Sequence, residues 1–247
     1  MSIFSRLIDI IYPPRCAACG EFLCKDGPEP ENKDLCFCRM CAADFHEITS
    51  PMCPICGAPF MSRTGEDHIC EECLRNRPFY EASAAPYLYE GAIMTAVHQF
   101  KYREKTFLSN SLGPVLSEFA KTWVKESGNI VTMPVPLHPK RLRERGYNQS
   151  LLLARHVAAK LDTELDFLSL RRVKYTLSQT GLGKEERRKN VRRAFRLVTP
   201  NAVKGKTVLL IDDVATTGNT LNECSRVLVR SDCKKVLCLT LARTPKG

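Results

Sequence analysis

Long hydrophobic runs are missing from this sequence. None of its apolar stretches approaches the roughly 20 residues that a membrane-spanning helix needs. The N-terminal stretch also lacks the small-residue cleavage site of a secretory signal peptide. We therefore expect a cytosolic chain that does not cross a membrane. Its 247 residues, 44% of them hydrophobic, are enough for a globular core in one or two domains.

Acidic residues are scarce in the C-terminal two thirds of the chain. Residues 81–247 contain 29 Lys and Arg against 15 Asp and Glu, a net charge of +14. Residues 1–80 contain 8 against 12, a net charge of −4. The basic surface therefore belongs to the C-terminal part. This change in charge, together with the cysteine distribution, predicts two domains, residues 1–78 and residues 79–247.

Ten of the thirteen cysteines fall between Cys16 and Cys73. In a reducing compartment they are better interpreted as metal ligands than as disulfides. Two Cys-x-x-Cys pairs supply the four thiolates of a tetrahedral Zn²⁺ ion, and the sequence contains two such quartets. The quartets are Cys16, Cys19, Cys38, Cys41 and Cys53, Cys56, Cys70, Cys73. Four thiolates leave no open position for water, so this pattern predicts two structural zinc ions in two zinc ribbons.

The pairing of these knuckles stays open at this point. A cross-braced arrangement uses the same eight cysteines, and Cys24, Cys36, His46 and His68 are spare ligands. Before the first knuckle, residues 2–12 place apolar side chains on one face of a short helix. That helix either docks onto its own domain or binds a membrane surface or a partner.

The pattern after residue 79 alternates strands and helices. We expect strands over residues 84–89, 130–135, 208–211 and 235–242, and helices over residues 93–100, 108–123, 151–161 and 218–231. Asn148 is the expected N-cap of the third helix, and His156 within it is expected to be structural. Alternating strands and helices predict an α/β fold with a parallel sheet flanked by helices.

Residues 208–220 carry the strongest chemical signal in the C-terminal part. Four apolar residues predict a buried strand, Asp212 and Asp213 follow it, and a loop of small residues then opens a helix. Backbone N–H groups and the positive end of a helix favour a phosphate at that loop. The two carboxylates suit the vicinal hydroxyls of a ribose, and an attached pyrophosphate would bring Mg²⁺. The competing interpretation is a solvated Asp-rich turn that caps the helix.

This stretch resembles the thirteen-residue phosphoribosyl pyrophosphate (PRPP) motif of type I phosphoribosyltransferases. The resemblance implies that the catalytic residues Asp212 and Asp213 hold the ribose. It implies a 5′-phosphate site at Ala215, Thr216, Thr217, Gly218, Asn219 and Thr220. Transferases of 6-oxopurines carry an Asp where this chain has Thr216, which argues against such a substrate.

Two basic segments flank this motif. The loop after the strand over residues 130–135 offers Lys140 and Arg141 to a pyrophosphate, unless it is only a solvated turn. In the type I fold, residues 174–196 occupy the place of a mobile flap, whose cations can clamp pyrophosphate. The competing interpretations are a nucleic-acid surface and a solvated basic helix without a ligand. The expected residues of the nucleic-acid surface are Arg143, Arg145, Lys184, Arg187, Arg188, Lys189, Arg192 and Arg193. The cluster of residues 100–103, Phe-Lys-Tyr-Arg, is either a core-to-surface junction or a ligand site.

The chain resembles the competence protein F family (ComF, ComFC type) over about residues 3–245. The resemblance rests on the order of its features, which are the zinc ribbons, residues 100–102, residues 145–149 and the PRPP motif. The resemblance implies a type I phosphoribosyltransferase-like domain behind a double zinc ribbon, and a link to natural transformation. It implies PRPP or ribose 5-phosphate, single-stranded DNA and a DNA-translocating ATPase as partners, in the cytosol or peripherally at the inner membrane. Glutamine amidophosphoribosyltransferase activity is not expected, because that reaction needs an N-terminal cysteine and the first cysteine here is Cys16.

Three hypotheses follow from the sequence. The chain is a DNA-uptake factor that binds PRPP and single-stranded DNA, a transferase acting on a small base, or a zinc-ribbon adaptor with a vestigial site. The basic flap and the ribbons favour the first over the second. The intact acidic pair argues against the third.

Overall fold

The computed structural model describes residues 15–23, 36–62, 64–101, 105–125, 128–175 and 191–245. The expected helix over residues 2–12 lies outside these ranges. So do Cys24, Tyr102, Lys184, Arg187, Arg188 and Lys189. None of the helices in the described ranges is long and apolar enough to span a membrane.

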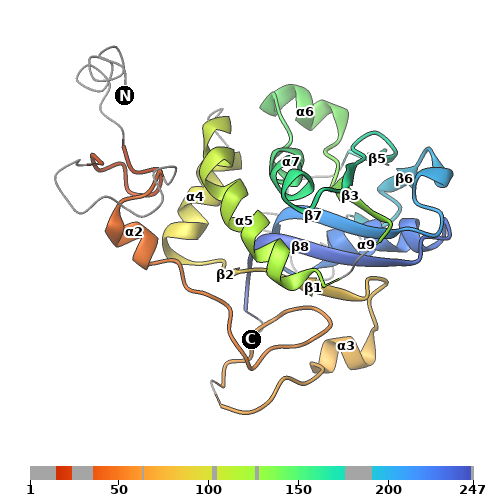
Figure 1. The fold of residues 1–247 in the computed structure, drawn as a ribbon, viewed down its shortest axis with the longest axis horizontal. Coiled ribbons are helices and arrows are strands. Elements are labelled where there is room, and N and C mark those ends of the chain that lie inside the picture. Colours follow the sequence, from red (N-terminus) through yellow and green to blue (C-terminus); the bar gives the residue numbers. More distant parts are fainter. Residues whose placement is uncertain are drawn as a thin grey trace.

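A parallel sheet forms the centre of the molecule (Figure 1). Its strands are ordered β1 (Ala82–Ala84), β8 (Lys235–Arg243), β7 (Thr207–Ala215), β3 (Ile130–Pro134) and β4 (Glu164–Leu165), and β2 (Tyr87–Leu88) also pairs with β8. Residues 208–211 of β7 are fully buried, which confirms a strand covered on both faces. The strand expected over residues 84–89 is instead the two short strands β1 and β2. Pro86, which has no N–H to donate, lies between them.

Helices cover both faces of this sheet, which confirms the expected α/β fold with a parallel sheet flanked by helices (Figure 1). On one face lie α4 (Gly91–Lys101), α5 (Ser109–Trp123) and α7 (Gln149–Leu161), and on the other α9 (Asn219–Val229). Asn148 caps α7 as expected, accepting a hydrogen bond from the Ser150 backbone N. Helices α5 and α7 approach so closely that a Cβ at Gly113 would lie 2.3 Å from the ring of His156, which therefore has a packing role.

The remaining elements are short. They are α2 (Arg39–Ala43), α3 (Glu71–Arg75), α6 (Pro139–Arg145), the 3₁₀ turns η1 (Thr106–Leu108) and η2 (Pro200–Ala202), and the antiparallel hairpin of β5 (Leu170–Arg172) and β6 (Phe195–Leu197). Helix α6 corrects one expectation, because residues 136–143 were expected to be a loop, and residues 139–143 belong to this helix. His138 caps this helix and Pro139 occupies its first turn, where a missing N–H costs nothing.

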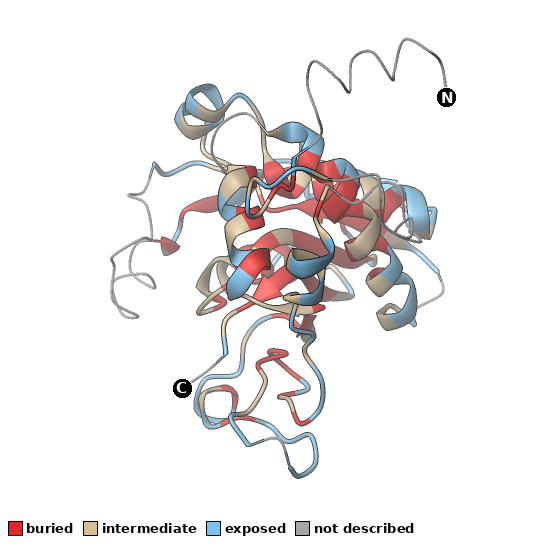
Figure 2. Cartoon of the chain, turned by 90° about the vertical axis from the view of Figure 1, so that its left-hand side faces the viewer, coloured by how far each residue is buried: buried red, intermediate tan, exposed pale blue. Residues whose placement is uncertain are grey.

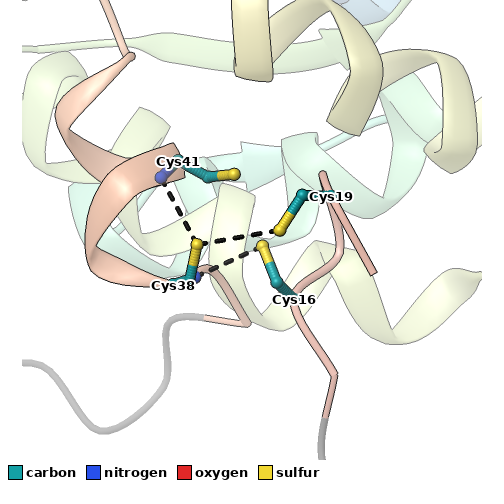
Figure 3. Close-up of side chains that lie close together, drawn as sticks. All are labelled: Cys16, Cys19, Cys38 and Cys41. Atoms are coloured by element: carbon teal, nitrogen blue, oxygen red, sulfur yellow. Dashed lines mark hydrogen bonds between the residues drawn. The ribbon is translucent and has the colours of Figure 1, made fainter. Parts of the chain in front are cut away.

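The cysteines form two groups in sequential order, which resolves the open pairing. The first group is Cys16, Cys19, Cys38 and Cys41, whose side chains converge from two segments (Figure 3), and the second is Cys53, Cys56, Cys70 and Cys73. In each group the four Sγ atoms lie within 4.8 Å of one another. A tetrahedral zinc with Zn–S bonds of about 2.3 Å places its sulfurs about 3.8 Å apart. The Cys19–Cys38 and Cys56–Cys70 Sγ distances are both 3.8 Å, so each group fits one zinc ion.

The described spare ligands Cys36, His46 and His68 lie outside both cysteine groups. His46 Nδ1 lies 2.7 Å from a Glu90 carboxylate oxygen, and the His68 ring stacks on Phe60 with centroids 3.9 Å apart. The backbone N of Cys36 donates to Ser111 Oγ at 3.1 Å. Neither histidine belongs to a cysteine group, so each described centre is a set of four thiolates.

Each cysteine group belongs to a different hydrophobic core. The second group is buried together with β7, β8 and α9 residues such as Val208 and Leu221, and Figure 2 shows buried segments in this ribbon next to the C-terminal end. The first group packs with α4, α5 and α7 on the opposite face, and its Cys19 is exposed. The two ribbons therefore stabilise opposite faces of the same sheet.

We predict two zinc ions per chain and unequal consequences of losing them. Cys53→Ser and Cys19→Ser should each reduce the zinc content by one ion, measured by elemental analysis. Cys53 is fully buried in the core of the sheet, so its loss should lower the free energy of unfolding by about 4 kcal/mol or more. Cys19→Ser should cost less, because that group is partly exposed. Equal destabilisation, or a wild-type content of one zinc, would contradict this assignment.

Candidate functional site

The two aspartates lie near the carboxyl end of β7. They were expected just beyond the strand, but pairing with β8 continues through Val214 and Ala215, so they lie within it. Asp212 Oδ1 accepts hydrogen bonds from Ser150 Oγ at 2.8 Å and from the Asp213 backbone N at 2.9 Å. The side chain of Asp213 points to a different partner. Its Oδ2 lies 3.1 Å from Lys101 Nζ.

Lys101 is the last residue of α4 and is held in place by residues from α7 and the turn before it. Tyr147 Oη and Gln149 Nε2 both donate to the carbonyl oxygen of Phe100, at 2.7 and 3.1 Å. Arg145 in turn donates to Gln149 Oε1 at 2.7 Å. The segment of residues 145–150 thus fixes the end of α4 beside the acidic pair. Sequence analysis left the role of residues 100–103 open, and this contact assigns Lys101 to the site.

Burial and charge change the protonation of these groups. Burial, and then the neighbouring Asp213 carboxylate, raise the pKa of Asp212 to about 7, although the Ser150 hydrogen bond opposes the shift. Burial alone would lower the pKa of Lys101, but the Asp213 carboxylate outweighs it and raises that pKa. The free protein therefore keeps one firm carboxylate–ammonium pair beside a carboxyl group that titrates near neutral pH.

The loop between β7 and α9 has the geometry of an anion cradle. Gly218 is the N-cap of α9 at φ +74° and provides no side-chain capping bond. The Asn219 backbone N donates to Thr217 Oγ1 at a long distance of 3.4 Å, so the positive end of the helix faces this loop with only a weak cap. Thr244 braces the loop, with its backbone N donating to the Ala215 carbonyl oxygen and its Oγ1 to that of Thr216, at 3.1 and 3.2 Å. Asn219 Nδ2 is buried without a hydrogen-bond partner.

A buried cation adds to the positive character of this loop. Arg243 is 1% exposed, and its Nε and both terminal nitrogens have no hydrogen-bond partner. Its Cα is the register partner of Ala215, the first residue of the loop. An arginine stays charged at any ordinary pH, so an unpaired buried guanidinium favours a nearby anion.

The expected pyrophosphate residues lie on α6. Lys140 is exposed, with Nζ 4.7 Å from the centre of the Tyr175 ring. Arg141 interacts electrostatically with Arg172 on β5, and Arg172 also interacts electrostatically with Asp212. Burial first, and then Arg141, lower the pKa of Arg172. Two cations that interact with each other, one of them also within electrostatic range of Asp212, suit a pyrophosphate. Sequence analysis missed Arg172, because only the β5–β6 hairpin brings it here.

The expected nucleic-acid residues are only partly described. Arg143 is exposed on α6, whereas Arg145 is committed to Gln149. Lys184, Arg187, Arg188 and Lys189 lie outside the described ranges. Arg192 and Arg193 are exposed next to α9, and the Arg193 backbone N donates to Glu223 Oε1 at 2.6 Å.

The sequence matches two known domain families in the same order as these parts. Residues 7–74 match the Double zinc ribbon domain, and residues 148–247 match the Phosphoribosyl transferase domain. These matches cover the two cysteine groups and the strand, loop and helix of the acidic pair.

Curated relatives match over most of their length. DNA utilization protein YhgH of Salmonella typhi is 31% identical over 213 residues, which cover 84% of this chain and 90% of that protein. Competence protein F of Haemophilus influenzae is 29% identical, with 83% of this chain and 96% of that protein covered. Competence protein ComFC of Bacillus subtilis is 27% identical, with 84% of each covered. The chain therefore belongs to the family of competence protein F, ComFC and YhgH.

Proposed function

We propose that this protein binds PRPP or ribose 5-phosphate with Mg²⁺ at the end of β7, and single-stranded DNA on the adjoining basic surface. The observation that carries the proposal is the acidic pair placed one short loop before a helix N-terminus with only a weak cap. The carboxylate pair accepts hydrogen bonds from the ribose hydroxyls, and the backbone N–H groups of the loop donate hydrogen bonds to the 5′-phosphate oxygens.

The surrounding cations complete a site for transfer of the ribosyl group. In such a reaction the bond between C1 of the ribose and pyrophosphate breaks, its electrons leave with pyrophosphate, and C1 bonds to an acceptor. Lys140, Arg141 and Arg172 would neutralise the departing pyrophosphate, and the ionised aspartates would stabilise the positive ribosyl centre. Mg²⁺, when bound with PRPP, would share the charge of the diphosphate.

Single-stranded DNA fits the charge of the same domain. The net charge of +14 on residues 81–247 favours binding of a phosphate backbone. Tyr147 is not expected to stack on an unpaired base, because its hydroxyl is hydrogen-bonded to the Phe100 carbonyl oxygen. Relatives are named for competence and DNA utilization. In this proposal the protein acts in natural transformation on the cytosolic side of the inner membrane. There it meets the incoming strand and a DNA-translocating ATPase.

One assay separates this function from its alternatives. Release of pyrophosphate from PRPP is measured with and without single-stranded DNA. Stimulation by DNA supports the DNA-uptake function. Release that depends on a small base and ignores DNA favours a small-base transferase, and a protein that binds neither PRPP nor DNA is a zinc-ribbon adaptor.

The acidic pair should be essential for binding PRPP. Asp212→Asn with Asp213→Asn should weaken PRPP binding at least tenfold, because each charge-assisted hydrogen bond contributes about 1.5 to 3 kcal/mol. Calorimetry with Mg²⁺ gives the affinity. Asp162→Asn is the matched control, since it makes the same change at the exposed C-cap of α7, in a left-handed conformation that Asn accepts. Unchanged affinity in the double variant would place PRPP elsewhere.

Binding should also depend on pH through Asp212. Its pKa of about 7 means that the ionised, accepting form falls about tenfold between pH 8 and pH 6. PRPP affinity should therefore fall by up to about this factor as the pH drops. The ligand titrates as well, so Asp212→Asn provides the baseline. A wild-type curve parallel to that of Asp212→Asn would show that Asp212 does not control binding.

Binding of single-stranded DNA should depend on salt but hardly on sequence. If about four phosphates are neutralised, log affinity should fall with log salt at a slope of about −3. Arg188→Glu with Arg192→Glu should flatten that slope and weaken all sequences alike. Equal affinity for duplex DNA, or an unaffected double variant, would limit the basic segment to a role with pyrophosphate.

A further inference from the structure

A cavity of about 580 Å³ lies between the end of the second ribbon and α9. One wall is formed by residues 72–80, the other by α9, and residues 191–193 and 217–219 complete the rim. The volume falls within the range of about 300 to 1,000 Å³ typical of ligand pockets. Neither aspartate of β7 lines it, so the cavity borders the phosphate loop without containing the acidic pair.

The lining is strongly cationic. It contains five arginines and two glutamates, which are Arg77, Arg192, Arg193, Arg226, Arg230, Glu72 and Glu223. Glu223 already accepts two hydrogen bonds from Arg226, at 2.9 and 2.6 Å, and one from the Arg193 backbone. Arg77, Arg192 and Arg230 are exposed, and none of them forms a salt bridge within the described ranges, although the charge of Arg192 helps to lower the pKa of Glu223. Three exposed guanidinium groups around one cavity favour a ligand with several negative charges.

An aromatic ring borders the same space. Phe79 is 45% exposed, and its backbone N donates to Asn222 Oδ1 at 2.7 Å, which ties this segment to α9. The unpartnered Nδ2 of Asn219 provides a hydrogen-bond donor where the cavity meets the loop. Cations for phosphates and an exposed aromatic ring for a base are the features of single-strand binding surfaces.

We propose that this cavity is a nucleotide subsite for single-stranded nucleic acid, with phosphates on Arg77, Arg192 and Arg230 and one base against Phe79. The proposal rests on the proposed function and extends it, because Arg77, Phe79 and Arg230 lie outside the basic segments of the phosphoribosyltransferase-like site. It also gives the second ribbon a direct part in binding, since Arg77 and Phe79 follow its last knuckle.

The test compares two double charge reversals of equal size in the full-length protein. Arg77→Glu with Arg230→Glu removes two cations of the cavity. Lys121→Glu with Arg155→Glu makes the same change at exposed positions of α5 and α7 outside it. Affinity for a labelled oligothymidylate of about 12 nucleotides is measured by fluorescence anisotropy across a salt series. The cavity variant should bind at least tenfold more weakly and lose about 1.4 from the salt slope, at about 0.7 per phosphate contact. The control variant should bind within about twofold of wild type.

Further arms identify the ligand and the contact. Phe79→Ala should weaken binding of the oligonucleotide, and Phe79→Tyr should restore it, because a tyrosine ring still stacks. PRPP affinity should be unchanged in the cavity variant, which shows an intact fold and phosphate loop. ATP is the probe for a free nucleotide. If Arg77→Glu with Arg230→Glu weakens ATP binding but leaves oligonucleotide binding unchanged, the cavity is a free-nucleotide site and the proposal is overturned. If the cavity variant binds the oligonucleotide as tightly as the wild type does, the subsite is overturned, but DNA binding by the protein is not. A wild-type protein that binds no oligonucleotide would refute the DNA part of the proposed function as well.

Discussion

Two adjacent carboxylates at the end of a buried strand are the constraint that the surrounding structure must satisfy. Asp212 and Asp213 cannot both stay ionised at low cost in a partly dry site, because they repel each other and have lost water. The ammonium group of Lys101 stabilises Asp213, and hydrogen bonds from Ser150 Oγ and the Asp213 backbone N stabilise Asp212. The end of α4 is held by Tyr147 and Gln149 so that Lys101 reaches its position. Residues 145–150, which look like a binding motif in the sequence, thus support the ion pair between Lys101 and Asp213.

The zinc centres solve a different problem, that of small modules without cores of their own. Each ribbon has too few apolar residues to fold alone, and four thiolates on a metal supply the missing stability. Each also packs onto one face of the sheet, the second ribbon with α9 and the first with α4, α5 and α7. The metal centres therefore influence the same two layers that carry the acidic pair and the phosphate loop. This placement also brings Arg77 and Phe79 next to α9.

Local signals predicted the elements that depend on neighbouring residues in the sequence. The quartets of cysteines, the buried strand over residues 208–211 and the Asn148 cap each follow from short-range spacing, and all three agree with the structure. Helix α6 was misjudged, although His138 as a cap and Pro139 in the first turn were available signals.

Contacts between distant segments could not be predicted in this way. Lys101 contacts Asp213 across more than 100 residues of sequence, and the hairpin of β5 and β6 brings Arg172 within electrostatic range of Asp212. Neither pairing has a periodicity or a fixed spacing that one sequence could reveal. The cavity beside α9 is a still clearer case, because its cations come from three separate segments and its charge exists only once they are assembled.

The ion pair between Lys101 and Asp213 also shapes how the site can accept a ligand. The Lys101 ammonium contacts Asp213 Oδ2, which is also an oxygen that a ribose hydroxyl would use under the proposed function. A ribose bound there would have to replace this contact with one of comparable strength, or bind beside it. The side chain of Lys101 is only 25% exposed, and its Nζ is committed to Asp213 at the end of α4. Under the proposed function, a bound polyphosphate would compete with Asp213 for this ammonium, and a lysine drawn toward the phosphate would leave both carboxylates to the ribose.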